Sequence, residues 1–301
     1  MKVVIIGAGA IGLLIGSFLS EQEHEITYIT KTTDQAEKLR KHGITRIRLN
    51  GKKVITNVLA HANFSLAPVD AIWIVAVKNH QLHNIEEVLH SLPPTTSLLF
   101  IQNGLAHIEL VNQLNNEHVY LASIEHAAMK QDATTVLHKG IGITRIAPFK
   151  TNTGNCLDLS IMQTPSFQIE MVDDAYGVIF RKVVLNACIN PLTAILQIKN
   201  GELITNKYAF HLMKSLFEEI VLGFPEIKQT ITFEDVKKLC VRTAQNNSSM
   251  LEDRLNNRKS EIEPIVGALL QLGKTRESDL PLLQSLYHLV LAIDEKGVPY
   301  E

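Results

Sequence analysis

Three polar residues recur every fourth position in an otherwise apolar stretch: Lys182, Asn186 and Asn190. This spacing stacks side chains on one face of an α-helix. The surrounding segment 183–189 is rich in Val, Leu, Ala, Cys and Ile, so much of the helix should be buried. Buried ammonium and amide groups cost free energy unless they find hydrogen-bond partners. We therefore expect this face to line a site that is wet or filled by a polar ligand.

The alternative interpretation is a helix whose polar stripe faces solvent. Asn is an unfavourable choice in a helix interior for that purpose. Pro191 comes next and should kink or end the helix, because it removes a backbone hydrogen bond. Further along, Ser249 with Glu252 forms an S-x-x-E capping box, and Ser260 ahead of Glu261 reads as a helix N-cap. Local chemistry alone gives both of these segments a purely structural explanation.

A glycine-rich turn near the N-terminus has the pattern G-x-G-x-x-G. It consists of Gly7, Ala8, Gly9, Ala10, Ile11 and Gly12. The turn directly follows a strand-like run, 3–6, and opens a helical run, 11–21, which is the setting of a dinucleotide-binding turn. There Gly7 permits the tight turn, Gly9 lets backbone approach a pyrophosphate, and Gly12 allows close helix packing. The phosphates would lie against the N–H groups at the helix start. A glycine turn without a ligand is the alternative.

The end of the second strand discriminates between NAD and NADP. An NAD site usually carries Asp or Glu there, to accept from the ribose 2′-hydroxyl. Here the strand 26–29 is followed by Thr30-Lys31-Thr32-Thr33, with no acidic residue before Asp34. Lys31 would attract a 2′-phosphate, so the sequence favours NADPH/NADP+. The alternative is that Lys31 is an ordinary solvated loop lysine.

Strand and helix patterns alternate through the first half of the chain, which predicts a parallel, doubly wound sheet. The predicted strands are 3–6, 26–29, 71–77 and 97–101, and the helices between them are 11–21, 34–42 and 80–92. Segment 136–146 resembles a β-hairpin that extends the sheet. From about Asp174 the chain is mostly helical, in segments 175–197, 207–222, 234–245, 263–272 and 280–294. We predict an α/β fold, with a Rossmann-type doubly wound domain at 1–172 and an all-α substrate domain at 173–301.

Composition limits the classes of partner. The 301 residues carry a formal net charge of -2 and no block of Lys and Arg, which argues against nucleic acid as a partner. Apolar runs such as 71–77 are too short to span a bilayer, and the first residues lead straight into a strand. We expect a cytoplasmic protein with no membrane association. The sequence leaves the oligomeric state open, a homodimer included.

The cysteines and histidines provide no sign of a metal or a disulfide framework. Cys156, Cys188 and Cys240 are far apart and lack C-x-x-C spacing, which suggests reduced thiols. Cys188 lies in an apolar helical stretch and is expected in the core. The 12 histidines show no H-x-x-x-H or H-E-x-x-H pattern, so we expect no metal site.

Across nearly its whole length the chain resembles the ketopantoate reductase (2-dehydropantoate 2-reductase) family. The matching blocks appear in order along the chain. They are 7–12, Lys78-x-x-Gln81, Gln102-Asn103-Gly104, His126-Ala127-Ala128, Arg181-Lys182 with Asn186, 189–194, Asn200-Gly201-Glu202-Leu203, 248–253 and Ser260-Glu261-Ile262-Glu263.

The resemblance implies roles for individual residues. Lys182 would be the catalytic lysine, and Glu261 the acidic partner near the substrate hydroxyl. The residues implied to contact substrate are Asn186, Asn190, Asn200 and Ser249. Those implied to join the glycine turn at the cofactor are Lys31, Lys78, Asn103 and Ala128.

The implied reaction is the reduction of 2-dehydropantoate to (R)-pantoate with NADPH, a step of pantothenate and coenzyme A biosynthesis. Lys182 would protonate and stabilise the developing alkoxide at C2. Two alternatives stay open: a reductase of another branched 2-keto acid, and an NADP(H)-sensing protein without catalysis. The chain also departs from the family pattern, with Lys31 where Arg is usual and Glu23 where Gly is common. Phe180 stands where Trp or Phe is usual, so this position agrees with the family pattern.

Overall fold

The computed structural model describes residues 1–151 and 158–295. Of the three cysteines considered above, Cys156 lies outside these ranges. The chain folds into two compact units. Unit 1 contains residues 1–102 and 108–178, and unit 2 contains residues 103–107 and those from 179 onward. The domain boundary between residues 172 and 173 stays a prediction.

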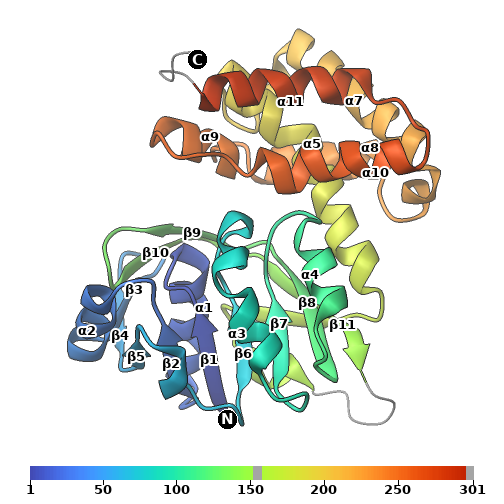
Figure 1. Cartoon of the computed structure of the whole chain (residues 1–301). Helices are drawn as coiled ribbons and strands as arrows, with labels where there is room; N and C mark the ends of the chain where they lie inside the picture. Colours follow the sequence, from blue (N-terminus) through green and yellow to red (C-terminus); the bar gives the residue numbers. More distant parts are fainter. Residues whose placement is uncertain (152–157, 296–301) are drawn as a thin grey trace. The chain divides into compact units, whose positions relative to one another are not determined.

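Unit 1 is built on an eight-stranded sheet of order β12-β11-β8-β7-β6-β1-β2-β5 (Figure 1). The pairs from β8 through β5 are parallel, and β11 runs antiparallel to β8. This confirms the predicted doubly wound sheet. The strand bounds are β1 Lys2–Ile6, β2 Glu25–Ile29, β5 Leu59–His61, β6 Ile72–Val75, β7 Ser97–Phe100, β8 His118–Ile124, β11 Ile143–Thr151 and β12 Gln168–Met171.

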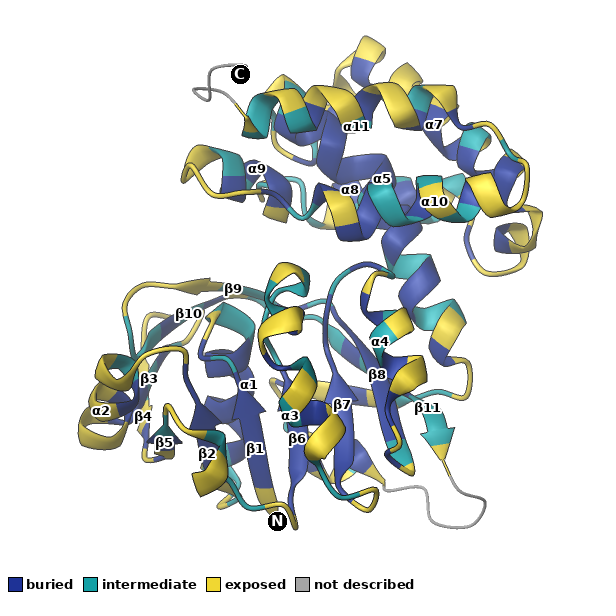
Figure 2. Ribbon diagram, viewed as in Figure 1, coloured by how far each residue is buried: buried dark blue, intermediate teal, exposed yellow. Residues whose placement is uncertain are grey.

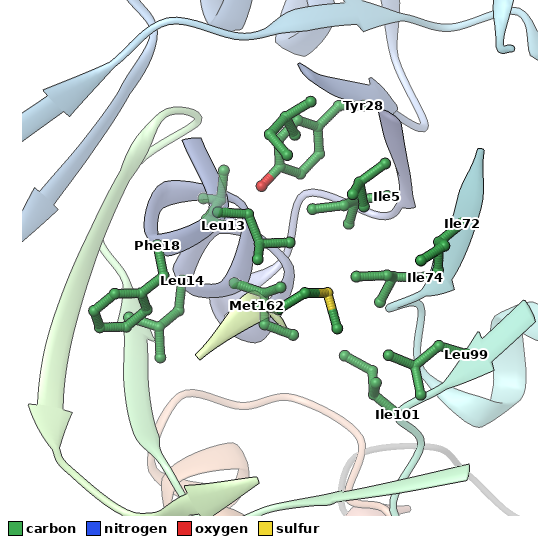
Figure 3. Close-up of a cluster of buried hydrophobic side chains, with 14 of the residues drawn as sticks. Ile5, Leu13, Leu14, Phe18, Tyr28, Ile72, Ile74, Leu99, Ile101 and Met162 are labelled. Carbon is green, nitrogen blue, oxygen red and sulfur yellow. The ribbon is translucent and has the colours of Figure 1, made fainter. Parts of the chain in front are cut away.

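The central strands form because their residues are apolar on both faces. All residues of β6 and of β7 are buried, as expected for strands covered on both sides. On one face, Figure 3 shows Ile5 and Ile74 of the strands pointing toward Leu13 and Leu14, with Met162 among them. These side chains belong to the main hydrophobic core of unit 1. The unit's helices are α1 Ala10–Glu21, α2 Thr33–His42, α3 Glu86–Ser91 and α4 His107–Gln113, with short helices η1 Phe64–Leu66, η2 Asn79–Asn84 and η3 Leu159–Met162.

A second sheet of four strands, β4-β3-β10-β9, packs against α1. Its strands are β3 Ile44–Ile47, β4 Lys53–Thr56, β9 Ala127–Lys130 and β10 Thr135–Gly140. The hairpin predicted over residues 136–146 is therefore wrong. β10 pairs with β9 and β3, whereas β11 joins β8 in the other sheet. The two glycines at 140 and 142 mark the passage of the chain from one sheet to the other.

Helix α1 ends in a Schellman motif, in which Glu23 is the left-handed residue. The amide N–H of His24 donates to the carbonyl of Leu19 at 3.2 Å, and that of Glu23 donates to Ser20 at 3.2 Å. Residue 23 consequently adopts φ 61°, a left-handed conformation that glycine adopts without strain. Glu23 occupies this position at an energetic cost.

Unit 2 consists of helices around the long helix α5, which is largely buried (Figure 2). The helices are α5 Ala175–Leu196, α6 Glu202–Thr205, α7 Lys207–Gly223, η4 Pro225–Gln229, α8 Phe233–Arg242, α9 Ser249–Leu255, η5 Glu263–Gly267, α10 Ala268–Thr275 and α11 Pro281–Asp294. Pro191 lies inside α5, and the helix continues to Leu196, so Pro191 does not end it. Cys188 and Cys240 are free and buried, as expected for core thiols.

Among the described residues, α5 alone is long and apolar enough to cross a membrane by length and composition. Of its most apolar window, 72% is buried inside the structure, and the core helix of a soluble protein passes the same test. The apolar runs of the sequence, such as 71–77, did not predict a helix of this length and hydropathy. The expectation of no membrane association stays a prediction.

Candidate functional site

The glycine turn joins β1 to α1 and leaves room for a ligand. Gly7 has φ 104°, a conformation that strains any other residue. Gly9 is the N-cap of α1, and no side chain caps the helix there by a hydrogen bond. A Cβ added at Gly9 would meet no atom within 4 Å. The first turn of α1 carries no acidic side chain. Open backbone N–H groups at a helix start without a carboxylate fit the phosphates of a dinucleotide.

Gly12 packs mainly against the turn itself. A Cβ at Gly12 would lie 2.2 Å from the carbonyl oxygen of Gly7, and 3.3 Å from Cβ of Ala76 on the sheet side. The buried Tyr28 hydroxyl donates to the Gly12 carbonyl at 2.7 Å. A Cβ at Gly16 would collide with this hydroxyl at 1.9 Å, so Gly16 is a fourth required glycine, beyond the three of the G-x-G-x-x-G pattern. The spacing of Gly12 and Gly16, four residues apart on one face of α1, could have indicated this close approach.

The end of β2 is polar, as predicted. Lys31 is exposed, and the N-cap of α2 is Thr32, whose hydroxyl accepts from the amide of Gln35 at 3.3 Å. The nearest acidic residue along the chain, Asp34, forms an ion pair with Lys38 at 2.7 Å. That pairing offsets in part the negative charge that follows Lys31 along the chain.

Gln102 holds the ends of β6 and β7 together. This side chain is 4% exposed, and its Nε2 donates to the carbonyl oxygens of Val75 at 2.9 Å and Val77 at 3.0 Å. Lys78, which is half-buried, comes directly after Val77, and its backbone amide donates to Gln81 Oε1 at 3.3 Å. The motif position Gln102 therefore fixes the backbone that carries Lys78, a role that the sequence did not reveal.

In unit 2 the predicted polar face of α5 is not a solvated stripe. Lys182 and Asn186 are half-buried, and Asn190 is 4% exposed. Asn190 Nδ2 donates to Ser249 Oγ at 3.3 Å, which joins two of the predicted substrate residues. The burial agrees with a face that lines a site, and it argues against the solvent-facing alternative.

Helix α9 is fastened to the C-terminal half of α5. Besides the Asn190 contact, Thr193 Oγ1 lies 2.7 Å from Ser248 Oγ, and Arg254 donates to the carbonyl oxygens of Ala194 and Ile195. Ser248 also accepts from the amide of Leu251 at 3.1 Å. The N-cap is thus Ser248, so the capping box predicted at Ser249 is wrong by one residue. Because Ser248 caps the helix, the Ser249 hydroxyl is available to Asn190.

Asn200 contributes a buried acceptor. Its Nδ2 donates to Thr243 Oγ1 at 2.9 Å, while its Oδ1 is buried without a hydrogen-bond partner in the part of the chain that the structure describes. Such an atom costs free energy unless a ligand donates to it. Asn200 therefore fits a position that contacts a hydroxyl-bearing ligand.

Glu261 is held by the segment that follows β7. Asn103 Nδ2 donates to Glu261 Oε2 at 3.2 Å, and the amide of Leu105 donates to the carbonyl of Pro264 at 2.9 Å. Ser260 does not act as an N-cap. Its hydroxyl donates to Asp294 of α11 at 2.6 Å, which anchors the residue before Glu261. The structure thus brings Asn103 and Glu261 together, although their roles were assigned to cofactor and substrate respectively.

A pair of histidines is buried beside Ala127 and Ala128 in unit 1. His126 Nδ1 lies 3.2 Å from His138 Nε2, and His138 faces Ala128 across the β9–β10 pairing. Burial, together with the neighbouring His138, lowers the pKa of His126 to about 4. Burial likewise lowers the pKa of His138. Both shifts favour the neutral imidazole, and the two rings lie in the core behind Ala128.

Within the described residues, no cluster of three or more His, Cys, Asp or Glu could hold a metal ion. The expectation of a metal-free site stays a prediction, because a metal can also bind fewer protein ligands.

Comparisons with known proteins agree with the geometry of both units. Residues 3–151 match the family model "Ketopantoate reductase PanE/ApbA", and residues 174–294 match its C-terminal counterpart. A 2-dehydropantoate 2-reductase of Listeria monocytogenes is 35% identical over 98% of this chain and 97% of the relative. The chain belongs to the ketopantoate reductase family. A 2-dehydropantoate 2-reductase of Bacillus subtilis is 33% identical over 98% of each chain.

Solved structures share the fold. A crystal structure described as a probable 2-dehydropantoate 2-reductase from Bacillus subtilis matches with a TM-score of 0.83 and 30% identity, over 97% of this chain and 100% of the other. D-mandelate dehydrogenase with NADH and anilino(oxo)acetate matches with a TM-score of 0.87 but 22% identity, over 98% of this chain and 99% of the other. The second likeness concerns the fold alone. Membership in the family supports a nicotinamide cofactor.

Proposed function

We propose that this protein reduces 2-dehydropantoate to (R)-pantoate with NADPH as the hydride donor. The observation that carries the proposal is the partly buried polar face of α5, where Asn190 bonds Ser249 and Lys182 lies two helical turns away on the same side. A family member that retained only cofactor binding would have no use for this face. Relatives from Listeria and Bacillus that match over nearly the full chain are named 2-dehydropantoate 2-reductase.

The residues of α5 would act on the substrate carbonyl. When bound, the reduced nicotinamide supplies hydride to C2. Lys182 donates a proton to the C2 oxygen and stabilises the negative charge that develops there, as general acid and electrostatic partner. Glu261 would lie near the substrate hydroxyl, and the amide of Asn103 orients its carboxylate.

The remaining amides would orient the substrate. Asn186 and Asn190 donate to its carboxylate or hydroxyl, together with the Ser249 hydroxyl. Asn200 Oδ1, buried and without a partner among the described residues, accepts from the substrate hydroxyl. Several neutral donors in a partly desolvated site can hold a carboxylate without an arginine.

The choice of NADPH rests on the end of β2. Lys31 stands where an acidic residue would select NAD, and Asp34 is paired with Lys38. Lys78, Asn103 and Ala128 would complete the cofactor site with the glycine turn. Because lysine offers a point charge and not the bidentate contact of arginine, we expect a clear but moderate preference for NADPH.

The test is the oxidation of NADPH by purified protein, followed at 340 nm, with 2-dehydropantoate and 2-ketoisovalerate as parallel substrates. Turnover should require the keto acid and should favour 2-dehydropantoate in kcat/KM. A preference for 2-ketoisovalerate would assign another branched 2-keto acid. NADPH binding without consumption on either substrate would instead identify a sensing protein.

The cofactor assignment has its own variant. Lys31→Glu places a carboxylate next to the 2′-phosphate, so KM for NADPH should rise at least tenfold while KM for NADH changes little. Lys41→Glu, at an exposed lysine of α2, is the matched control for the change in net charge. An unchanged NADPH/NADH ratio in Lys31→Glu would remove Lys31 from the 2′-phosphate site.

A further inference from the structure

Lys130, at the end of β9, reaches the glycine turn although it lies far from it in sequence. Its Nζ donates to the carbonyl oxygen of Ala8 at 2.9 Å. The residue is exposed, yet partial burial of the ammonium lowers the pKa of Lys130, and the charge of Asp132 opposes this less strongly. No local sequence pattern predicted that Lys130 would place its ammonium group at the middle of the glycine turn.

The Ala8 carbonyl accepts a second hydrogen bond, from Gln35 at the start of α2. This bond shows that the carbonyl faces the end of β2. Gln35 Nε2 donates to Ala8 O at 3.1 Å and to the carbonyl of Ala133 at 2.8 Å. Gln35 lies in the first turn of α2, whose N-cap Thr32 directly follows Lys31. In this fold the end of the second strand meets the adenosine ribose. Lys130 therefore approaches the same end of the dinucleotide as Lys31.

The charge of Lys130 is not neutralised by a close carboxylate. In the described part of the chain, its ammonium forms one hydrogen bond, to Ala8, and no ion pair within 4.0 Å. Asp132 is engaged instead in the β9–β10 turn, where its Oδ1 accepts from the amides of Thr134 and Thr135 at 2.8 Å. Two of the three N–H donors of Lys130 are thus available to an anion.

We propose that Lys130 is a second cation for the 2′-phosphate of the dinucleotide, acting together with Lys31. This inference rests on the proposed function, specifically on its NADPH preference. One exposed lysine at the strand end would bind a phosphate dianion weakly. Two lysines, Lys31 and Lys130, would bind it more strongly. The Ala8 carbonyl, which Gln35 also bonds, holds the ammonium in place before the cofactor arrives.

The experiment measures binding of cofactor fragments, independently of turnover. Isothermal titration calorimetry of the whole protein with adenosine 2′,5′-bisphosphate and with adenosine 5′-monophosphate isolates the 2′-phosphate. The wild type should prefer the bisphosphate. Lys130→Gln can still donate to Ala8 but lacks the charge, and it should weaken bisphosphate binding about tenfold with less than a threefold change for the monophosphate. Lys130→Arg should retain most of the preference.

Two control variants separate charge from structure. Gln35→Met removes the bonds from Gln35 to Ala8 and to Ala133 without a change of charge, so it should affect both fragments alike. Lys139→Met removes an exposed lysine from the neighbouring strand β10 and should leave the preference intact. The loss in Lys130→Gln should also shrink with added salt, because screening weakens the contribution of exposed charges.

The outcomes distinguish this inference from the function on which it rests. Equal losses for both fragments in Lys130→Gln, or a loss no greater than that of Lys139→Met, would overturn the role of Lys130 while the NADPH preference of the wild type stands. A wild type that does not discriminate between the fragments would overturn both. Thermal melting of each variant checks that the glycine turn is still folded.

Discussion

Asn103 and Glu261, separated by 158 positions in the sequence, form a direct hydrogen bond from the amide Nδ2 to the carboxylate Oε2 at 3.2 Å. Family resemblance assigns the first residue to the cofactor and the second to the substrate. Their contact means that one carboxylate oxygen is already oriented by the protein. Because the amide is a neutral donor, it positions Glu261 without cancelling its charge.

This pair predicts different effects for two substitutions of Asn103. Asn103→Ala removes the hydrogen bond from a neutral amide to the Glu261 carboxylate and should lower kcat/KM by about tenfold. Asn103→Asp places a second carboxylate against Glu261, and like-charge repulsion should cost about tenfold more and make the activity depend on pH below 7. Steady-state kinetics with 2-dehydropantoate from pH 5 to 9 provide the measurement. Equal kinetics in the two variants would mean that the contact does not persist in the working enzyme.

Lys182 is predicted to act in the chemical step and not in cofactor binding. Lys182→Ala should lower kcat by ~10²-fold or more, because it removes both the proton donor and the positive charge near the developing alkoxide. The Kd for NADPH, measured by fluorescence titration, should change less than threefold. Lys199→Ala, at an exposed lysine of unit 2, is the control for loss of charge. Retained turnover in Lys182→Ala would exclude the proposed mechanism.

Gly104 is predicted to be essential to the loop that carries Asn103. Its φ is 89°, and a Cβ there would lie 2.0 Å from the carbonyl oxygen of Pro264. Gly104→Ala should therefore destabilise the protein by about 2–4 kcal/mol, from backbone strain and overpacking together. Gly51→Ala is the matched control, since Gly51 has φ 77° but open space around it, and it should cost only about 1 kcal/mol. Chemical denaturation of both variants tests the difference, and equal losses would show that crowding by Pro264 is relieved.

The sequence predicted those features that are written in local patterns. The glycine turn, the buried strands β1, β2, β6 and β7, and most helices follow from apolar periodicity and caps. It missed β3, β4, β5, β8 and β9. Strands of three or four residues with mixed polarity, such as Ile44–Ile47, owe their structure to pairing with distant strands. β8 is different, because its seven residues are almost all buried and its apolar run was a local signal that went unused. The hairpin error at 136–146 has the same origin, since the local pattern does not identify the partner strand.

The candidate site was predictable where it lies along one helix and not where it depends on tertiary contacts. The spacing of Lys182, Asn186 and Asn190 was sufficient to predict a shared, partly buried face. Nothing in the sequence around Lys130 or Gln102 indicates that they reach the backbone of another loop. The shift of the α9 cap from Ser249 to Ser248 arises because two adjacent serines satisfy similar capping patterns.

Glu23 offers a stabilising substitution. It occupies the C′ position of the Schellman motif that ends α1, with φ 61°. Glu23→Gly should remove left-handed strain and, after the greater entropy of glycine in the unfolded chain, stabilise the protein by about 0.5–1 kcal/mol. Asn257→Gly, at φ 51°, should gain less, because Asn tolerates this conformation better than Glu. Urea unfolding compares the two, and a destabilised Glu23→Gly variant would show that the Glu23 side chain makes a compensating contribution.

The buried histidine pair predicts a loss of stability in mild acid. Burial lowers the pKa of His126 to about 4, against an ordinary value near 6.5 in the unfolded chain. Between these values the unfolded chain binds more protons than the folded one, so the free energy of unfolding must fall as the pH drops from 6.5 to 4, and this group adds no further loss below pH 4. His107, whose pKa is also lowered to about 4 by burial, acts in the same direction. The melting temperature of the wild type should accordingly decrease steadily across this window.

Substitution of His126 isolates its share of that slope. His126→Gln removes the titrating group, so its melting temperature should depend less on pH between 6.5 and 4 than that of the wild type, even if it is lower at pH 7.5. His138→Gln removes the neighbour whose charge helps to lower the pKa of His126, and it should also flatten the slope. His42→Gln, at an exposed position, is the control and should leave the slope unchanged. If His126→Gln loses as many degrees as the wild type over this range, His126 is already protonated in the folded state or does not titrate with folding, and its neutral burial behind Ala128 is wrong.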